Sequence, residues 1–279
     1  MTYEEYLRLV DELNHHCVRY YLLNDPIISD KDYDELYRRL LEYERLNPDK
    51  IVPDSPSRRV GFKVEGGKTI RHEIKMLSLD NVYNSFELGD FIQKVLKNLK
   101  SEPLWTVEPK IDGAAVSIIY EDGVLRAAIS RGDGIEGEDI THTVRTIKSL
   151  PVRIPDNSRI VVRGEVFLSK KSFNKINQER GRLGEPLFAN PRNAAAGTLK
   201  LLDPEIAARR GLDIFIYALD YGRKFDSHYK DLQYLKGIGF SINEYVVLVE
   251  TKDIFERISF IENIKRDLSY EIDGVVIKV

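Results

Sequence analysis

Residues 105–113, Trp-Thr-Val-Glu-Pro-Lys-Ile-Asp-Gly, place a lysine and an Asp-Gly step after a run of strand-forming residues, and residues 116–120, Val-Ser-Ile-Ile-Tyr, supply a second such run. β-Branched and aromatic residues favour strands, whereas Asp-Gly favours a turn. Lys110 is therefore predicted to lie in a short turn between two strands. Gly113 has no side chain to obstruct a close approach between the backbone and a bound ligand such as a nucleotide.

Lys110 is a candidate nucleophile. A lysine of ordinary pKa, about 10.4, is protonated at neutral pH, so it attacks phosphorus only if burial or a neighbouring cation lowers that pKa. The final segment, residues 271–278 (Glu-Ile-Asp-Gly-Val-Val-Ile-Lys), offers Lys278 as such a cation. A reactive lysine and a second lysine on the same phosphate are what covalent nucleotidyl transfer requires. An isolated Lys-x-Asp-Gly is more often a surface lysine beside a turn, so this hypothesis depends on motifs elsewhere in the chain.

Three further segments carry residues or turns that could contribute to a ligand-binding site. Arg131 begins an Arg-Gly-Asp-Gly sequence after a predicted strand, and its guanidinium can bind a carboxylate, a phosphate or a ribose oxygen. Glu165 lies in an apolar strand-like run, where a carboxylate is either ion-paired or accepts a hydrogen bond from a sugar hydroxyl. The Asn190-Pro191 step indicates a loop entering a helix.

Together these segments resemble the bacterial NAD-dependent DNA ligase family, in its N-terminal and nucleotidyltransferase domains. The resemblance runs from the first helix to Val279 and includes residues 76–81 (Met-Leu-Ser-Leu-Asp-Asn) and 131–145 in order. In that family the lysine matching Lys110 attacks the α-phosphate of NAD, releases nicotinamide mononucleotide (NMN) and carries AMP as a phosphoramidate. The resemblance thus implies the first step of nick sealing in DNA replication and repair.

The resemblance also assigns site residues. Lys110 and Lys278 are the implied catalytic residues; Lys278, with Asp273, closes the site and neutralises charge on the α-phosphate. The implied cofactor-binding residues are Tyr20, Tyr21, Asp30, Tyr33 and Asp34 on the NMN half of NAD, Ser78 and Leu79 in a strap against NAD, Glu108 near the adenine or ribose, Arg131 and Glu165 at the ribose, Tyr217 stacked on the adenine, and Lys278. The residues alone favour packing roles for the tyrosines, including a sheet-core role for Tyr217, and helix N-terminal roles for Asp30 and Asp34. Some relatives carry histidine at the position of Tyr21.

The sequence predicts no protein cluster of metal ligands. Magnesium is the implied ion, held mainly through phosphate oxygens, with Asp112 as an alternative contact through water. His15 and His16 lack nearby carboxylates or cysteines at metal-binding spacing. Cys17 is the single cysteine, which excludes an internal disulfide.

Composition restricts the class of protein. The 279 residues carry 42 Lys plus Arg against 45 Asp plus Glu, a net charge of −3, so any surface for DNA must be local. The N-terminus lacks a signal-peptide pattern and no apolar run is long enough to cross a bilayer. We expect a cytoplasmic monomer whose full-length form acts on nicked double-stranded DNA.

The chain is predicted to fold as α+β, with an N-terminal helical hairpin followed by a nucleotidyltransferase domain of the ATP-grasp-like DNA ligase and mRNA capping enzyme type. Apolar residues at helical spacing predict two helices before Pro48, the first with a Thr2–Glu5 capping box. Residues 48–75 are expected to form a linker or mobile strap. The domains are predicted as 1–70, the NMN-binding hairpin with its strap, and 71–279, the adenylation domain.

The pattern of the second domain favours largely antiparallel sheets. Strands are expected at 104–109, 115–120, 124–130, 159–168, 213–221, 244–249 and 272–279, and helices at 86–99, 138–148, 171–180, 228–236 and 252–266.

Two departures from the family pattern bear on function. Arg192 matches an arginine near the AMP phosphate and DNA, but Lys200 stands where relatives often have a second arginine, which keeps the charge without the planar fork. Family enzymes also continue beyond Lys278 to a further lysine motif and additional domains, so we expect a truncated catalytic fragment that does not seal nicks alone. The alternatives are a nucleotidyltransferase that uses ATP or GTP, and a catalytically weak NAD-binding fragment.

Overall fold

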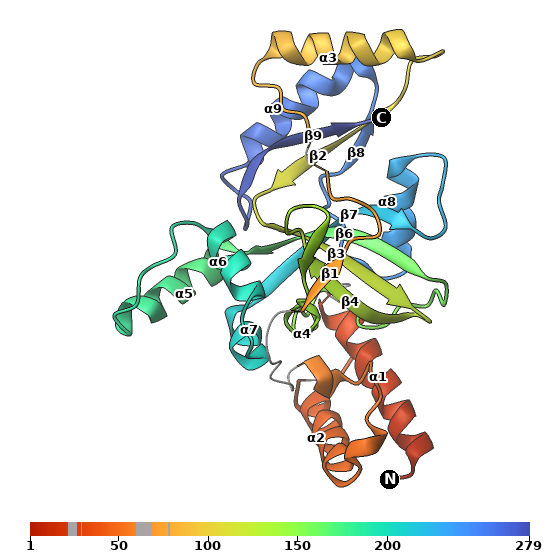
Figure 1. Cartoon of the computed structure of the whole chain (residues 1–279), viewed down its shortest axis with the longest axis vertical. Coiled ribbons are helices and arrows are strands. Elements are labelled where there is room, and N and C mark those ends of the chain that lie inside the picture. Colours follow the sequence, from red (N-terminus) through yellow and green to blue (C-terminus); the bar gives the residue numbers. More distant parts are fainter. Residues whose placement is uncertain (22–26, 29, 60–67, 78) are drawn as a thin grey trace.

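The structure is a computed structural model that describes residues 1–21, 27–28, 30–59, 68–77 and 79–279. Figure 1 shows a helical hairpin at one end of the molecule, a central four-stranded sheet and, at the other end, a three-stranded sheet covered by helices. Every strand pair in these sheets is antiparallel. The predicted α+β class with antiparallel sheets is confirmed.

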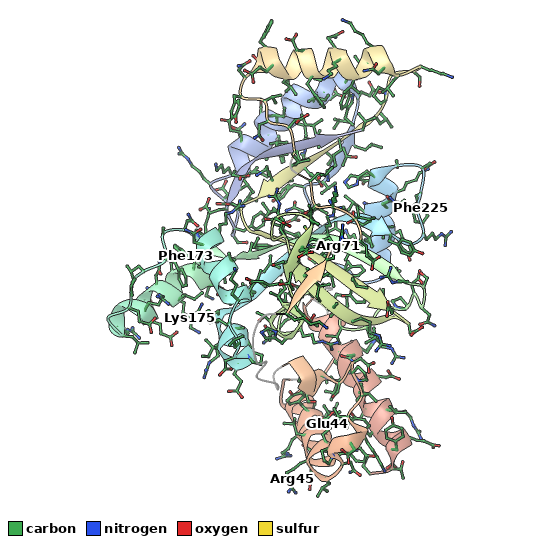
Figure 2. The ribbon with its side chains drawn as sticks, in the orientation of Figure 1. Glu44, Arg45, Arg71, Phe173, Lys175 and Phe225 are labelled. Atoms are coloured by element: carbon green, nitrogen blue, oxygen red, sulfur yellow. The ribbon has the colours of Figure 1, made fainter. Side chains whose placement is uncertain are left out.

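The hairpin consists of α1 (Tyr3–Tyr21) and α2 (Asp30–Leu46). The predicted capping box is present, since the Thr2 amide donates to the Glu5 carboxylate at 2.7 Å and the Glu5 amide to the Thr2 hydroxyl at 3.2 Å. Glu44 is buried between the helices and accepts hydrogen bonds from the hydroxyls of Tyr6, at 2.8 Å, and Ser55, at 2.5 Å (Figure 2). Around this network the helices bury an apolar seam: Tyr6, Leu9, Val10, Leu13, Leu40 and Tyr43.

Two arginines dock the hairpin end of the chain onto the central domain. Arg153 pairs through Nη1 with Asp11, at 2.5 Å, and with Asp54, at 3.5 Å. The Arg145 guanidinium donates to the Pro53 carbonyl at 2.6 Å. In Figure 1 the hairpin lies on the side of the central sheet where α4 (Thr141–Val144) is found.

The expected strap contains more regular structure than a linker. Two 3-10 helices, η1 (Pro48–Lys50) and η2 (Pro56–Arg59), are followed by β1 (Thr69–Arg71), which pairs with β5 (Glu136–Glu138). The backbone amide of Met76 then donates to Gly134 O at 2.9 Å. The segment 68–77 is therefore bound to the central domain and is not part of a mobile linker.

The central sheet has the strand order β4-β3-β6-β7. Its strands are β3 (Ala114–Glu121), β4 (Val124–Ser130), β6 (Ile160–Leu168) and β7 (Leu212–Tyr221). The helices of this part of the chain are α4 (Thr141–Val144), α5 (Lys170–Arg182), α6 (Pro191–Leu199), α7 (Pro204–Arg210) and α8 (His228–Gly237). Strands and helices share one core in which residues such as Ile118, Ile214 and Leu232 have no exposed surface.

The three-stranded sheet has the order β8-β2-β9, and the chain's last strand pairs with the strand that carries Lys110. Its strands are β2 (Trp105–Ile111), β8 (Val247–Val249) and β9 (Ile272–Lys278), and α3 (Ser85–Asn98) and α9 (Ile254–Ile264) cover it, with η3 (Thr251–Asp253) leading into α9. Phe167 of β6 and Phe215 of β7 pack into the apolar cluster of this sheet. This second cluster therefore contains side chains from both sheets.

The predicted helix over 138–148 is wrong in extent, because only Thr141–Val144 is α-helical and Glu136–Glu138 is a strand. The reason lies in β4: the amide of Ile140 donates to Ala128 O at 2.9 Å, and the Thr141 hydroxyl accepts from the Ala128 amide at 2.8 Å. These bonds hold the segment against the sheet, where it cannot continue a helix. Helix α7 was not expected, and the strand expected at 244–249 is limited to Val247–Val249.

Candidate active site

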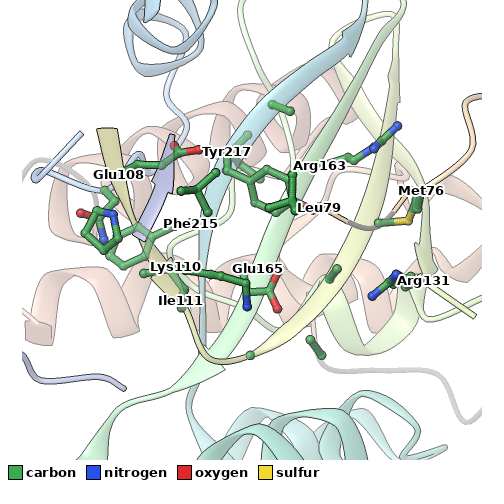
Figure 3. Close-up of a pocket in the computed structure, with 18 of the residues that line it drawn as sticks. Met76, Leu79, Glu108, Lys110, Ile111, Arg131, Arg163, Glu165, Phe215 and Tyr217 are labelled. Atoms are coloured by element: carbon green, nitrogen blue, oxygen red, sulfur yellow. The ribbon is translucent and has the colours of Figure 1, made fainter. Parts of the chain in front are cut away.

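A cavity of about 590 Å³ lies where the two sheets meet (Figure 3). It gathers seven of the predicted site residues from segments far apart in the sequence. They are Leu79, Glu108, Lys110, Arg131, Glu165, Tyr217 and Lys278.

Lys110 is part of β2, so the prediction that it lies in a turn is wrong. It pairs with Gly274 of β9, and the next ladder pair joins Ile111 to Ile272. Asp273 is therefore the extra residue of a β-bulge, which turns a side chain out of the regular alternation. Its carboxylate reaches the Lys110 ammonium, with Nζ at 2.8 Å from Oδ1 and 2.7 Å from Oδ2.

Gly113 is required by the fold itself. A Cβ at this position would lie 2.3 Å from the Val166 carbonyl oxygen of β6. The backbone that approaches Gly113 closely is thus the neighbouring strand; Gly113 also lines the cavity, so its expected role toward a nucleotide stays a prediction. Beside it, Asp112 pairs with Arg192 at the start of α6, with Oδ1 at 3.4 Å from Nη1.

Lys278 lies at the other end of the same strand pair. It faces Thr106, four residues along β2 from Lys110, which is about 13 Å in an extended strand. Its ammonium forms an ion pair with Glu108 and also contacts the Tyr217 carbonyl at 3.4 Å and His228 Nε2 at 3.1 Å. In this arrangement the second of the two predicted catalytic lysines is bound to a protein carboxylate.

Glu108 is 4% exposed. Burial alone raises the pKa of its carboxyl, but the charge and the hydrogen bond of Lys278, with His228 nearby, outweigh that effect and lower the pKa below its usual value. Glu108 is therefore held as a carboxylate. Burial likewise raises the pKa of the Tyr217 phenol, which keeps it neutral.

Glu165 behaves differently from Glu108. Burial raises the pKa of its carboxyl to about 7, while Arg192 and Lys110 act in the opposite direction with less effect. Near neutral pH this residue is present in both protonation states. Its carboxyl can therefore donate a hydrogen bond to a bound hydroxyl when protonated, or accept one from it when ionised.

Arg131 is held at the cavity by its own loop. The backbone amide of Arg131 donates to Ala115 O at 3.1 Å, and Gly132 follows with a φ of 55°. From the strap, His72 Nε2 lies 3.1 Å from both the Ser130 and the Arg131 carbonyl oxygens. The strap and the arginine loop are thus joined next to the cavity.

The hairpin supplies no cavity residue within the part of the chain that the structure describes. Tyr33 is half-buried against the hairpin core and stacks on Tyr37, with ring centroids 6.3 Å apart. Ser78, and the side chains of Tyr20, Tyr21, Asp30 and Asp34, lie outside the described residues.

Several residues in or beside the cavity were not singled out in the sequence. Arg163 and Phe215 line it, each two residues from a predicted site residue on the same strand, Glu165 and Tyr217 (Figure 3). Strand alternation, which puts residues i and i+2 on one face, would have indicated both. His228 gave no such signal, because it joins the site only through the packing of α8 on β7.

Within residues 1–21, 27–28, 30–59, 68–77 and 79–279, no group of three or more His, Cys, Asp or Glu side chains is arranged to hold a metal ion. Among the same residues no helix has the length and apolarity needed to span a bilayer.

Antiparallel sheets enclosing a cavity with a strand-borne lysine form the arrangement expected of a nucleotidyltransferase. Comparison with protein families narrows this class: residues 66–279 match the NAD-dependent DNA ligase adenylation domain, and residues 2–61 match the DNA ligase-like, N-terminal NAD+-binding domain. The chain belongs to the NAD-dependent DNA ligase family.

Individual relatives agree with this assignment. The DNA ligase of Caldicellulosiruptor bescii is 48% identical over 276 residues, which cover 97% of this chain and 41% of the relative. The DNA ligase of Thermotoga neapolitana is 46% identical over 283 residues, covering 99% of this chain and 40% of the relative. The chain thus spans about two fifths of the length of these curated relatives. A solved mycobacterial DNA ligase D complexed with ATP and MES is 14% identical, with a TM-score of 0.37 over 63% of this chain and 48% of that chain.

Proposed function

We propose that this chain carries out the adenylation half-reaction of an NAD-dependent DNA ligase. Lys110 attacks the α-phosphate of NAD; an N–P bond forms, the P–O bond to NMN breaks, and AMP remains on the lysine as a phosphoramidate. The observation that carries this proposal is the position of Lys110, whose ammonium enters the cavity from a strand end held by Asp273.

The ammonium of Lys110 must lose a proton before it can attack. Asp273 is the group suited to accept it, because both of its carboxylate oxygens are within hydrogen-bonding distance of Nζ. The bulge in β9 supports this role, since it directs Asp273 toward Lys110.

The remaining cavity residues suit the other parts of the nucleotide. We assign Glu165 and Arg131 to the ribose, Tyr217 to the face of the adenine and Glu108 to the edge of the adenine. Leu79 would contact NAD from the strap. Lys278 is the second catalytic cation. To contact the α-phosphate it must exchange at least one of its present partners, Glu108, His228 and the Tyr217 carbonyl.

We assign NMN recognition to the hairpin, through Tyr20, Tyr21, Asp30, Tyr33 and Asp34, within a first domain of residues 1–70. Ser78 is assigned to the strap against NAD. Segment 68–77, whose first three residues fall within that predicted first domain, is bound to the central domain and therefore moves with the adenylation domain when the hairpin approaches the cavity. The contacts of Arg145 and Arg153 with residues 11 and 53–54 would separate in that motion.

Magnesium, bound through phosphate oxygens, would supply positive charge to the transition state. Asp112, which pairs with Arg192 in this structure, is the carboxylate that would contact the ion through water. For the whole protein we propose nicked double-stranded DNA as the substrate, with Arg192 and Lys200 near its phosphates.

The test is intact-mass measurement after incubation with NAD and magnesium, on protein first freed of AMP by excess NMN. Wild-type protein should gain the mass of AMP, and Lys110→Ala should gain none. Lys230→Ala, which removes an exposed lysine of α8, is the matched control and should label like the wild type. An AMP adduct on Lys110→Ala would contradict the assignment, and labelling by ATP as readily as by NAD would favour a triphosphate-using nucleotidyltransferase.

The role of the hairpin is tested by single-turnover adenylation. Tyr33→Ala and Asp34→Asn should slow the reaction with NAD, but should not alter the hydrolysis of a premade Lys110–AMP adduct, which no longer contains the NMN half. Tyr3→Ala, at an exposed tyrosine of the same hairpin, is the control. Unimpaired NAD rates in both variants would remove the hairpin from the reaction.

A further inference from the structure

His228 is the first residue of α8 and lies at the Lys278 end of the cavity. The preceding residue, Ser227, caps the helix by accepting from the Lys230 amide at 3.3 Å. This cap fixes the start of the helix, and with it the position of the imidazole. The His228 side chain is 16% exposed, and charged groups from two strands lie close to its Nε2: Glu108 Oε1 of β2 at 3.9 Å and Lys278 Nζ of β9 at 3.1 Å.

The contact with Lys278 defines the protonation of the ring. An ammonium carries three N–H donors and no acceptor. His228 Nε2 lies 3.1 Å from Lys278 Nζ, so a hydrogen bond between them requires Nε2 to be the acceptor. The imidazole must then be neutral with its proton on Nδ1, because a proton on Nε2 would place donor against donor.

Two other histidines show the opposite pattern. Nε2 of His142 lies 2.8 Å from the Leu201 carbonyl, and Nε2 of His72 lies 3.1 Å from two carbonyl oxygens. A carbonyl oxygen only accepts, so both rings must carry a proton on Nε2. The chain therefore contains internal references for both tautomers.

The three acceptors around Lys278 act differently. The ion pair with Glu108 supplies charge, which has little directional preference, whereas the imidazole nitrogen and the Tyr217 carbonyl accept along defined lone-pair directions. A lysine side chain has a flexible four-carbon stem, so its ammonium loses its orientation readily when such acceptors are removed.

We propose that His228 is a positioning residue: as the Nδ1-protonated neutral imidazole, it accepts a hydrogen bond from the Lys278 ammonium and fixes where the second cation of the nucleotide cavity stands. The inference rests on the proposed function only in giving Lys278 a part in adenylation. The tautomer itself is a property of the free protein.

The first experiment is 15N NMR of the imidazoles in the free chain, with the His228 signals assigned by their loss in His228→Gln. His228 should show an unprotonated Nε2 and a protonated Nδ1, while His72 and His142 should show protonated Nε2. A protonated Nε2 on His228 at neutral pH would overturn the proposal. This result does not depend on whether the protein reacts with NAD.

The second experiment measures single-turnover adenylation as a function of NAD concentration. His228→Leu removes the acceptor. It should lower the adenylation rate or raise the half-saturating NAD concentration, whichever of the two Lys278→Ala changes, by about ten-fold. His228→Gln, which can present an amide oxygen near the position of Nε2, should recover most of the loss. Ser227→Ala, which removes the helix cap and keeps the imidazole, is the control for a merely structural effect of α8.

A double-mutant cycle completes the test. If His228 acts through Lys278, His228→Leu should have no further effect in the Lys278→Ala background. A full loss in that background, or an equal loss in Ser227→Ala, would overturn the proposal. If the wild-type chain forms no AMP adduct with NAD, the proposed function fails, and the NMR result alone decides the position of the proton on His228.

Discussion

The cavity contains two lysine–carboxylate pairs on the same pair of strands, and their surroundings differ. In the pair between Lys110 and Asp273 the side chains are 37% and 38% exposed. In the pair between Lys278 and Glu108 they are 24% and 6% exposed. The first pair sits at a β-bulge, and the second sits where the ladder is regular.

This difference separates a lysine that can be released from one that is held. An exposed ion pair is screened by water and contributes about 0–1 kcal/mol, so Lys110 can leave Asp273 at little cost. Removing one partner of a buried pair leaves an uncompensated charge and costs about 3–5 kcal/mol. A nucleophile requires the first situation, and a fixed electrostatic group requires the second.

The largest effect is expected for Lys278→Ala. It leaves the Glu108 carboxylate buried without its cation, so we expect a loss of about 4 kcal/mol in the free energy of unfolding, together with slower adenylation. Urea denaturation measures the first and single-turnover labelling the second. Lys110→Ala is the matched comparison and should cost less than about 1 kcal/mol of stability; equal losses for the two variants would remove the distinction between the pairs.

A smaller, pH-dependent effect is expected at the Lys110 end for Glu165→Gln. The pKa of Glu165 is raised from 4.5 to about 7 by burial, so the folded protein keeps a proton that the unfolded chain releases. The stability that this carboxyl contributes is fully present below pH 4.5 and is lost as the pH rises through 7.

Glutamine stays neutral at every pH, so Glu165→Gln should be more stable than the wild type by about 3 kcal/mol at pH 8 and equal to it near pH 4.5. Urea unfolding at both pH values provides the measurement. Glu121→Gln, at the exposed side of a surface ion pair with Arg159, is a suitable control. A difference between wild type and variant that does not change with pH would place the titration elsewhere.

The smallest effect is expected for Asp273→Asn, which should change the free energy of unfolding by less than about 1 kcal/mol and less still at high salt. The matched change in the buried pair, Glu108→Gln, should cost clearly more and respond less to salt. Parallel urea titrations at low and high ionic strength compare the two. A larger loss for Asp273→Asn than for Glu108→Gln would reverse the comparison.

Most elements of the fold were predictable because their signals are local. The Thr2–Glu5 box and the apolar spacing of α1 and α2 gave the hairpin, and the Asn190-Pro191 step gave the start of α6, where the Asn190 side chain accepts from the Asn193 amide at 2.8 Å. The region 138–148 was not predictable, since its conformation is set by hydrogen bonds to β4 and not by its own residues.

The sequence singled out residues that the structure brings together, but it did not predict their contacts. Leu79, Arg131, Glu165 and Tyr217 line one cavity, and their roles toward a nucleotide stay predictions. The binding of Lys278 by Glu108 and His228 was not foreseen, because it depends on strand register and on the packing of α8.

The sequence by itself determined the antiparallel α+β class, the family and the candidate nucleophile, since helix caps, strand propensities and short motifs act over a few neighbouring residues. Tertiary structure decided the environment of each lysine. Lys110 meets Asp273 across 163 positions of chain, and Lys278 meets His228 across 50. Such contacts depend on the pairing of β2 with β9 and on burial in a shared core, which set the local water content and therefore which ion pair holds and which releases its lysine.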